Sequence, residues 1–501
     1  MLSLALYAFS CTSTFAGEKP LGPLASTAST YFVASNGSDV GPGTINRPWA
    51  TINHAAENAN AGDMVVVRGG HYILPAQVRP RSSGRSGAWI TFIGYPGEVP
   101  ILDAQSIMPK YLPGALNNGA FQIEGVSHIR VANLSVVNSH DAGFTVRDSS
   151  DIELINNMTD GTFSSGIAVW DTNHDDRGTE HIRIVGNTIT RATTWDLAPP
   201  DVPRRGEPPH EALSIGGAVD FEVAYNHIYD SDKEGIDIKE TSKRGRVHHN
   251  LVHDIPRQGI YVDAWFGKLS DIEIFSNVVH HCRFSGFALS VEGGEFAEKI
   301  NFHDNLIFDN GGSGVYFSRW GNNNLRDNIR ITRNIFYRNG YATPNIGQTY
   351  FWQTGGLYLY STNLRDILIE KNIFSENRGF QIGYSELFLQ DGRSWEFVAR
   401  DKRIAIIDNL INGDNETGSP IESGGAPIDQ VRIFAANGDG AIFGDPLFRN
   451  AAMYDFSLLS GSPAIQAHLV AKGYSPTVQS MSWWKRNFPP KLIHVPFDKT
   501  K

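Results

Sequence analysis

The chain has 501 residues, among them 50 Gly, 25 Pro and 2 Cys, and 11% of its residues are aromatic. Its formal net charge of −10 and isoelectric point near 5.9 argue against nucleic acid as a partner, because nucleic-acid-binding domains carry a basic surface. The two cysteines, Cys11 and Cys282, supply neither a disulfide framework nor a metal cluster, and no later apolar run is long enough to span a membrane.

The N-terminal residues 1–17 combine an apolar stretch with small residues, which predicts a signal peptide and a secreted or periplasmic protein. A linker over 18–30 follows. Residues 49–59 read as a short amphipathic helix, and we expect it to cap the open end of a solenoid whose cap and first coils span 31–110.

An asparagine recurs every two to three dozen residues in the pattern apolar-x-apolar-x-x-Asn. This period and the apolar i, i+2 spacing predict an all-β solenoid, a parallel β-helix over 111–470, with the asparagines stacked in one ladder. The preference of parallel crossovers makes this a right-handed parallel β-helix. A tail at 471–501 follows. The strong copies end at Asn157, Asn187, Asn226, Asn277, Asn305, Asn334, Asn372 and Asn409; Asn250 belongs to a weaker copy, and Asn133 sits one residue early.

A glycine opens a second recurring pattern, in which the first and third residues after it are apolar and the second and fourth vary. Gly235-Ile236-Asp237-Ile238-Lys239 and Gly259-Ile260-Tyr261-Val262-Asp263 are examples. Strand residues alternate between faces and parallel strands lie ~4.8 Å apart, so the varying residues should form columns on one exposed sheet face. Two long loops, 193–210 and 339–353, interrupt the coils and are expected to flank sites.

The columns bring chemistry-bearing residues together. Asp237, Lys239, Tyr261 and Asp263 should form a square, with Glu292 one coil beyond. A solvated charged face would look similar residue by residue, but carboxylates beside aromatic rings suit saccharide binding. Catalysis is therefore assigned to Asp237, Lys239, Asp263 and Glu292. The surrounding polar and aromatic residues are assigned to substrate binding: Trp170, His210, Glu211, Glu234, Tyr261, Trp265, Tyr316, Arg319, Trp320 and Tyr358.

The segment from Tyr31-Phe32-Val33-Ala34 through Pro48-Trp49-Ala50-Thr51-Ile52 to Gly69-Gly70-His71-Tyr72 resembles the N-terminal segment of secreted right-handed parallel β-helix carbohydrate-active enzymes of the pectate-lyase-like superfamily. Asp263, followed one coil later by Glu292, is similar to an acid pair of β-helix xylosidases. Glu234-Gly235-Ile236-Asp237-Ile238-Lys239 is similar to a calcium-coil motif of some pectate lyases, which makes calcium a candidate cofactor. The next coil departs from that motif, with Gln258 and Tyr261 where those lyases carry calcium-binding Asp.

Three functions remain open. A glycoside hydrolase, which we favour, needs two carboxylates across the scissile bond. A polysaccharide lyase needs a base such as Lys239 and a cation, yet Asp237 and Asp263 beside Lys239 favour its charged form. The third alternative is a protein that binds carbohydrate without cleaving it, or an epimerase. The expected partner is a polysaccharide or oligosaccharide bound by a monomer.

Overall fold

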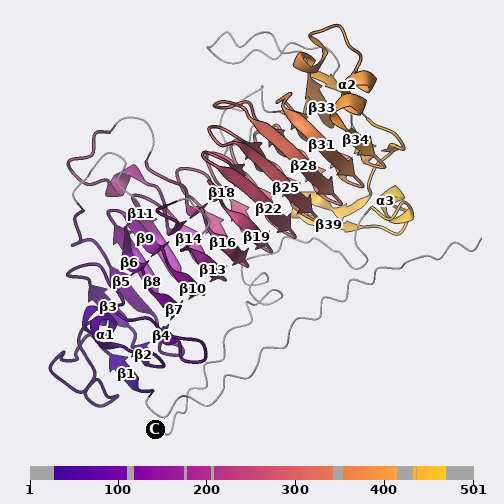
Figure 1. Cartoon of the computed structure of the whole chain (residues 1–501). Helices are drawn as coiled ribbons and strands as arrows, with labels where there is room; N and C mark the ends of the chain where they lie inside the picture. Colours follow the sequence, from indigo (N-terminus) through magenta and orange to yellow (C-terminus); the bar gives the residue numbers. More distant parts are fainter. Residues whose placement is uncertain are drawn as a thin grey trace, which may run out of the picture.

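The computed structural model describes residues 28–109, 118–173, 178–204, 208–341, 354–413, 433–435 and 437–469. The signal peptide expected over residues 1–17, Cys11, most of the loop 339–353 and the tail 471–501 lie outside these residues. The described strands form three long sheets that run the length of an elongated molecule (Figure 1). From β4 onward, successive coils contribute strands to the three sheets in turn, so the fold is the predicted parallel β-helix.

The first sheet, called sheet A, has 13 strands, all paired in parallel between neighbours. Its strands are β1 (Thr30–Val33), β2 (Met64–Val67), β4 (Ile90–Gly94), β7 (Ser127–Ala132), β10 (Ser150–Ile155), β13 (Glu180–Val185), β16 (Val219–Ala224), β19 (Lys243–His248), β22 (Lys268–Phe275), β25 (Phe296–His303), β28 (Leu325–Thr332), β31 (Leu364–Glu370) and β34 (Ile404–Ile407).

The second sheet, sheet C, also has 13 strands and follows sheet A within each coil. Its strands are β3 (Gly70–Ile73), β5 (Pro100–Asp103), β8 (Ser135–Ser139), β11 (Met158–Thr162), β14 (Thr188–Thr190), β17 (His227–Tyr229), β20 (Leu251–His253), β23 (Val278–His280), β26 (Leu306–Phe308), β29 (Ile335–Tyr337), β32 (Ile373–Ser375), β35 (Leu410–Asn412) and β37 (Ile442–Phe443).

The third sheet, sheet D, has 11 strands and carries the Gly-anchored segments. Its strands are β6 (Gly119–Glu124), β9 (Ala142–Arg147), β12 (Ile167–Trp170), β15 (Leu213–Gly216), β18 (Ile236–Lys239), β21 (Ile260–Asp263), β24 (Phe287–Ser290), β27 (Val315–Phe317), β30 (Leu357–Leu359), β33 (Ile382–Ser385) and β36 (Ile433–Ala435). Only its last pair, β33 with β36, is antiparallel.

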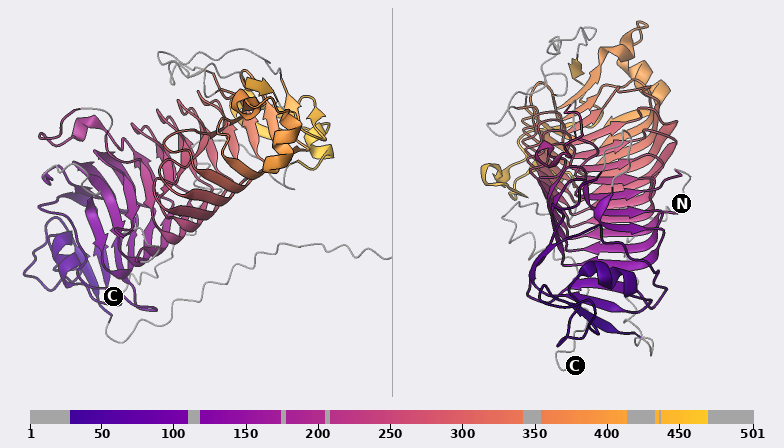
Figure 2. Two further views of the ribbon diagram at one scale, coloured as in Figure 1. Left: turned by 45° about the horizontal axis from the view of Figure 1, so that its top comes forward. Right: turned by 90° about the vertical axis from the view of Figure 1, so that its left-hand side faces the viewer.

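Helices lie at the two ends of the stack (Figure 1, Figure 2). The helix α1 (Ile52–Asn58) begins at Thr51, whose hydroxyl accepts the amide of His54, and it buries Ile52, Ala55 and Ala56 in the core. This confirms the predicted capping helix. The other end carries α2 (Trp395–Lys402) and α3 (Pro463–Gln466), and 3₁₀ turns occur at η1 (Trp195–Leu197), η3 (Glu386–Leu389) and η4 (Ala451–Met453).

The C-terminal described residues turn back onto the outer face of sheet C. The hairpin of β38 (Phe448–Asn450) and β39 (Asp455–Leu458) contributes Phe456 to an apolar cluster with Leu306, Phe308 and Ile335. This cluster is separate from the main core, which fills the space between the three sheets. The hairpin therefore covers an apolar sheet face that would otherwise be exposed.

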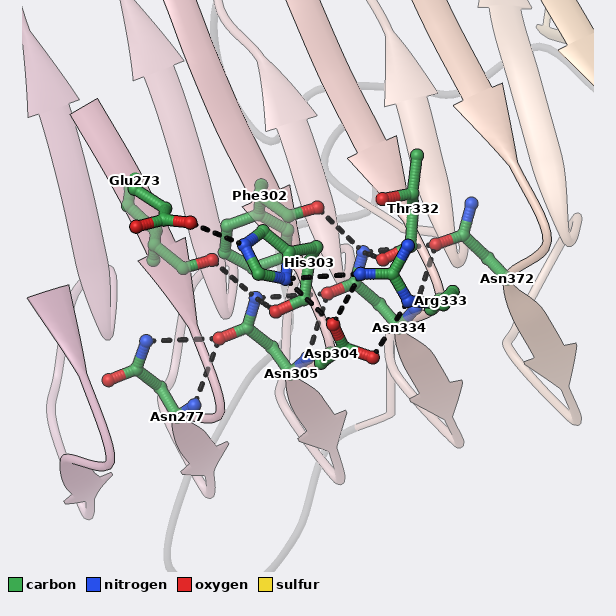
Figure 3. Close-up of polar contacts among 11 residues, drawn as sticks. Glu273, Asn277, Phe302, His303, Asp304, Asn305, Thr332, Arg333, Asn334 and Asn372 are labelled. Atoms are coloured by element: carbon green, nitrogen blue, oxygen red, sulfur yellow. Dashed lines mark hydrogen bonds and ion pairs between the residues drawn. The ribbon is translucent and has the colours of Figure 1, made fainter. Parts of the chain in front are cut away.

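The asparagine ladder stands at the corner between sheets A and C (Figure 3). Each side-chain amide donates to the side-chain oxygen of the next asparagine and to a backbone carbonyl of the preceding coil; Asn305, for example, donates to Asn334 at 2.9 Å and to the Ile274 carbonyl at 3.0 Å. Every inward amide is thus satisfied. The ladder runs through Asn157, Asn187, Asn226, Asn250, Asn277, Asn305, Asn334, Asn372 and Asn409, which confirms the prediction.

A second, shorter ladder stands between sheets C and D. Asn310 donates to Asn339, Asn339 to Asn377 and Asn377 to Gln381, with distances of 2.9 Å. The sequence pattern did not predict this ladder, because these residues lie outside the apolar-x-apolar-x-x-Asn units. It fixes the turns that lead into β27, β30 and β33.

Candidate active site on sheet D

The outer face of sheet D carries the predicted columns. Paired registers place Asp237 beside Tyr261 and Lys239 beside Asp263, while Ile236 and Ile238 on the same strand point into the main core. The orientation predicted from the Gly-anchored pattern is therefore confirmed.

The strand β15 of this sheet does not follow the glycine pattern. The strand β15 lies between β12 and β18, so Gly216 separates Trp170 from Lys239 and the two are not immediate neighbours. The pattern fails here because Ala212, not glycine, precedes this strand.

The expectation that these columns are exposed is wrong. Nine predicted site residues are 9% exposed or less: Trp170, Glu211, Glu234, Asp237, Lys239, Tyr261, Asp263, Tyr316 and Tyr358. Their side chains lie against one another and against residues of the adjoining turns. The outer face of sheet D is consequently a strip of packed, largely desolvated side chains, in which charges interact strongly.

A lysine surrounded by acids forms the centre of this strip. The Lys239 ammonium lies 2.6 Å from Glu211 Oε2 and 3.6 Å from Asp237 Oδ2. A second ammonium, that of Lys233, lies 3.7 Å from the other oxygen of Glu211, and Ser214 donates to Glu211 at 2.9 Å. Glu211, predicted as a binding residue, is thus the main counter-ion of the predicted catalytic lysine.

The acids of this cluster differ in their tendency to ionise. Burial opposes ionisation of Glu211, but Lys239 and Lys233 outweigh it and hold the pKa of Glu211 below its usual range. Burial and the charge of Glu211 raise the pKa of Asp237 well above its usual range. Burial and Glu292 do the same to the pKa of Asp263. Carboxyl groups with lowered and raised pKa values therefore lie close together, on the segment that enters β15, on β18 and on β21, an arrangement suited to acid–base catalysis.

Lys239 is held in its charged form. Burial alone would lower the pKa of Lys239, but the charges of Glu211 and Asp237 outweigh it and raise the pKa above its usual value. A base must be neutral to accept a proton, so this environment makes Lys239 a poor base and a good fixed cation.

Glu292 lies on the turn after β24 and is held by Tyr261, whose hydroxyl donates to Glu292 Oε1 at 2.5 Å. Glu292 is partly exposed, whereas Asp263 is buried. The guanidinium of Arg326 is fully buried and donates to the Ser318 carbonyl at 2.9 Å. Burial lowers the pKa of Arg326 to about 10, against the charges of Tyr261 and Asp263.

Trp170 lies flat across a glycine. A Cβ at Gly216 would come within 2.5 Å of the Trp170 ring, so only glycine leaves room for the indole there. The ring reaches Lys239, whose ammonium is 5.9 Å from its centre. The ring of His210 stands edge-on to Trp170 at 6.0 Å, and burial with Lys239 lowers the pKa of His210 to about 4.

The aromatic part of the strip divides into a buried and an exposed group. Tyr261, Tyr316 and Tyr358 pack with Ala288 and Phe380 in one cluster. Three predicted binding residues retain exposed surface around it: Trp265 is 50% exposed, Arg319 is exposed with its guanidinium 5.3 Å from the Tyr360 ring, and Trp320 is partly exposed. These three, and not the tyrosines, present surface to a ligand.

Two further polar residues of the strip, Arg257 and Glu240, were not predicted as site residues. Arg257 lies 2.8 Å from Glu234, so Glu234, a predicted binding residue, is already paired with a cation. Both amide atoms of Gln258 and one carboxyl oxygen each of Asp237 and Asp263 are buried with no hydrogen-bond partner among the described residues. Glu240 is buried as well, and burial raises its pKa to about 7. Unpartnered buried polar atoms are costly and commonly mark a binding site.

The candidate calcium site does not fit these residues. Within the described parts of the chain, no group of three or more His, Cys, Asp or Glu side chains is arranged to hold a metal ion. The acids of the calcium-like motif face cations of the chain itself: Glu234 faces Arg257, and Asp237 faces Lys239. The neighbouring Glu211 faces both Lys239 and Lys233.

A cavity of about 500 Å³ lies beside the N-terminal coils, lined in part by Gln77, Arg79, Asn118 and Asp141. Burial raises the pKa of Asp141 to about 7. The catalytic residues predicted on β18 and β21 do not line this cavity.

Cys282 is a buried free thiol, as expected. No helix in the described ranges is both long and apolar enough to cross a membrane.

Comparison with known families matches two segments. Residues 31–193 match the Pel9A-like right-handed β-helix region, and residues 118–297 match the right-handed β-helix region. The uncharacterized protein YwoF of Bacillus subtilis (strain 168) is 27% identical over 93% of this chain and 97% of its own length. Pectate lyase PEL9 of Emericella nidulans is 28% identical over 28% of this chain and 35% of its own length.

Solved structures with similar folds include XylC in complex with xylose, with 13% identity and a TM-score of 0.46 over 84% of this chain and 87% of that one. The pectate lyase Pel9A has 12% identity and a TM-score of 0.36 over 87% and 90%. Its matched segments and its three parallel sheets show that the chain has a right-handed parallel β-helix fold, similar over residues 31–193 to the Pel9A-like β-helix region.

Proposed function

We propose that this protein is a glycoside hydrolase that cleaves a polysaccharide or oligosaccharide on the outer face of sheet D. The observation that carries the proposal is the placement of Asp263, buried on β21, near the partly exposed Glu292: burial and the charge of Glu292 raise the pKa of Asp263 well above its usual range. A buried acid held neutral near pH 7 can protonate a leaving oxygen.

In this proposal Asp263 is the general acid and Glu292 is its partner. Asp263 gives its proton to the glycosidic oxygen as the bond to the sugar carbon breaks. Glu292, held by the Tyr261 hydroxyl and partly exposed, is in reach of the water or sugar carbon that completes the reaction. The Lys239 ammonium, with Asp237 beside it, is a fixed cation next to Asp263 and orients the substrate.

The exposed aromatic residues support a saccharide as the substrate. Trp265 offers an exposed ring on the turn directly after β21, two residues from Asp263. The apolar C–H face of a sugar can stack on such a ring while its hydroxyls face the neighbouring polar groups. An enzyme for extracellular polysaccharide needs export, which agrees with the signal peptide expected over residues 1–17.

A polysaccharide lyase is the second candidate, favoured by the Pel9A-like match and by the similarity to pectate lyase PEL9. The Pel9A-like segment ends at residue 193, before Glu211, Asp237, Lys239, Asp263 and Glu292. It therefore does not cover the chemistry of the candidate site, and the charged state of Lys239 disfavours the lysine as a base.

One experiment distinguishes the two activities. The protein is incubated with a panel of neutral and uronate-containing polysaccharides, and reducing ends and ultraviolet absorbance are followed together. Hydrolysis yields reducing ends without new absorbance, whereas β-elimination yields an unsaturated product that absorbs. Absorbance rising in step with the reducing ends would replace the hydrolase by the lyase.

A further inference from the structure

The acids of the calcium-like motif are paired with cations of the chain itself, and the pairing has a consequence for cofactor use. We propose that the Lys239 ammonium is the built-in cation of this site. It takes the place between Glu211 and Asp237 that a calcium ion would need, so the site functions without a divalent metal.

The contacts place the ammonium at the centre of the acids. Lys239 Nζ is 2.6 Å from Glu211 and 3.6 Å from Asp237. Calcium binds carboxylate oxygens at about 2.3–2.6 Å, so it would have to occupy nearly the same position as this nitrogen. Lys233 faces the other oxygen of Glu211 at 3.7 Å, which leaves neither oxygen of Glu211 free of an ammonium.

Burial makes this pairing hard to displace. The side chains of Lys239, Glu211 and Asp237 are 10%, 9% and 3% exposed. Removing an ion from its partner in a desolvated site leaves an uncompensated charge, which is strongly unfavourable. A calcium ion entering beside Lys239 would also add two positive charges to a cluster in which two ammonium groups already face Glu211.

At the positions that correspond to the motif, the flanking coil has no charged side chain that could bind a metal ion in place of Glu211 and Asp237. Glu234 is held by Arg257 at 2.8 Å. The next coil presents Gln258 and Tyr261 at the corresponding positions, and both are neutral. Calcium affinity depends on the number of charged ligands, so the flanking coil does not make up for the Glu211 and Asp237 oxygens that the ammonium occupies.

The test uses terbium, which binds calcium sites and emits when a nearby tryptophan is excited. The Trp170 ring centre stands 5.9 Å from the Lys239 nitrogen, so an ion in that place would be sensitised by it. We expect no calcium-displaceable emission from the wild-type protein up to about 1 mM, the weak end of protein calcium sites. Lys239→Ala should gain such emission, and the further change Glu211→Gln should remove it again.

The matched control is Lys268→Ala, which removes an exposed lysine paired with Glu295 at 3.4 Å and should gain no emission. Calcium-displaceable emission from the wild type that Glu211→Gln abolishes would overturn the proposal. So would a folded Lys239→Ala variant that gains none. If Lys239→Ala does not fold, the wild-type titration with Glu211→Gln decides alone. The readout needs no substrate, so its failure is distinguishable from failure of the hydrolase proposal.

Discussion

The Lys239 ammonium lies 2.6 Å from Glu211 Oε2, although 28 residues separate the two along the chain. The contact joins the segment that enters β15 to the outer face of β18. The contact lowers the pKa of Glu211 and raises the pKa of Lys239, so it favours the charged form of both groups. Burial and the neighbouring acids raise the pKa of Asp237 and of Asp263, which lie beside this pair.

The asparagine ladder should carry much of the stability. Asn305→Ala removes the partners of Asn277, Asn334 and the Ile274 carbonyl inside the stack. We expect a loss of about 2–4 kcal/mol in the free energy of unfolding, because buried groups are left unsatisfied. Urea unfolding measures it. Asn301→Ala, on the partly exposed outer face of β25, is the control and should change stability by less than about 0.5 kcal/mol.

The fit of Trp170 over Gly216 can be tested by a double-mutant cycle. Gly216→Ala places a methyl group 2.5 Å from the indole and should cost about 1–3 kcal/mol of stability. In the background of Trp170→Ala the same change should cost much less, because the ring is gone. Additive effects of the two changes in urea unfolding would contradict this packing.

Activity should fall on the alkaline side as Asp263 loses its proton. Glu240, whose pKa burial raises to about 7, is ionised above that pH, and its charge then raises the pKa of Asp263. Glu240→Gln removes this charge and should move the alkaline limb of the kcat/KM profile to lower pH. Glu295→Gln, an exposed acid, should leave the limb in place. An upward shift for Glu240→Gln would mean that Asp263 is not the titrating acid.

Trp265 should contribute substrate binding more than chemistry. Trp265→Ala removes an exposed ring, and we expect KM to rise about tenfold, equivalent to about 1.4 kcal/mol, with kcat nearly unchanged. Phe397→Ala on α2, also an exposed aromatic residue, should change neither constant. Steady-state kinetics on the best substrate of the panel would reveal a kcat effect if Trp265 acts in the chemical step.

The sequence predicts the fold well because each coil repeats the same physical requirement. An inward-facing asparagine side chain needs a hydrogen-bond partner, which the asparagine of the next coil supplies. Alternating apolar residues must all face the same core, so the spacing along the sequence sets both the ladder and the strand register. Asn250 joins the ladder despite its weak flanking pattern. The strand Leu213–Gly216 escapes prediction because the glycine landmark is absent there.

The site is predicted less completely, for a reason of geometry. Spacing along a strand places Asp237, Lys239, Tyr261 and Asp263 on one face, but it does not tell what the turns bring over that face. Glu211 comes from the segment after a long loop, and Tyr316 and Tyr358 are buried by their own neighbours. Contacts from outside the strands therefore decide charge and exposure.

The central claim is that a carboxyl group, and not Lys239, performs the proton transfer. The most direct measurement compares the turnover of Asp263→Asn and Lys239→Met on the best substrate, with unfolding curves to show that both are folded. We expect Asp263→Asn to lose at least about 10²-fold in kcat, because acid–base catalysis usually contributes that much. We expect Lys239→Met to retain measurable hydrolysis. Near wild-type turnover of Asp263→Asn together with an inactive Lys239→Met would contradict it and assign the protein to the lyases.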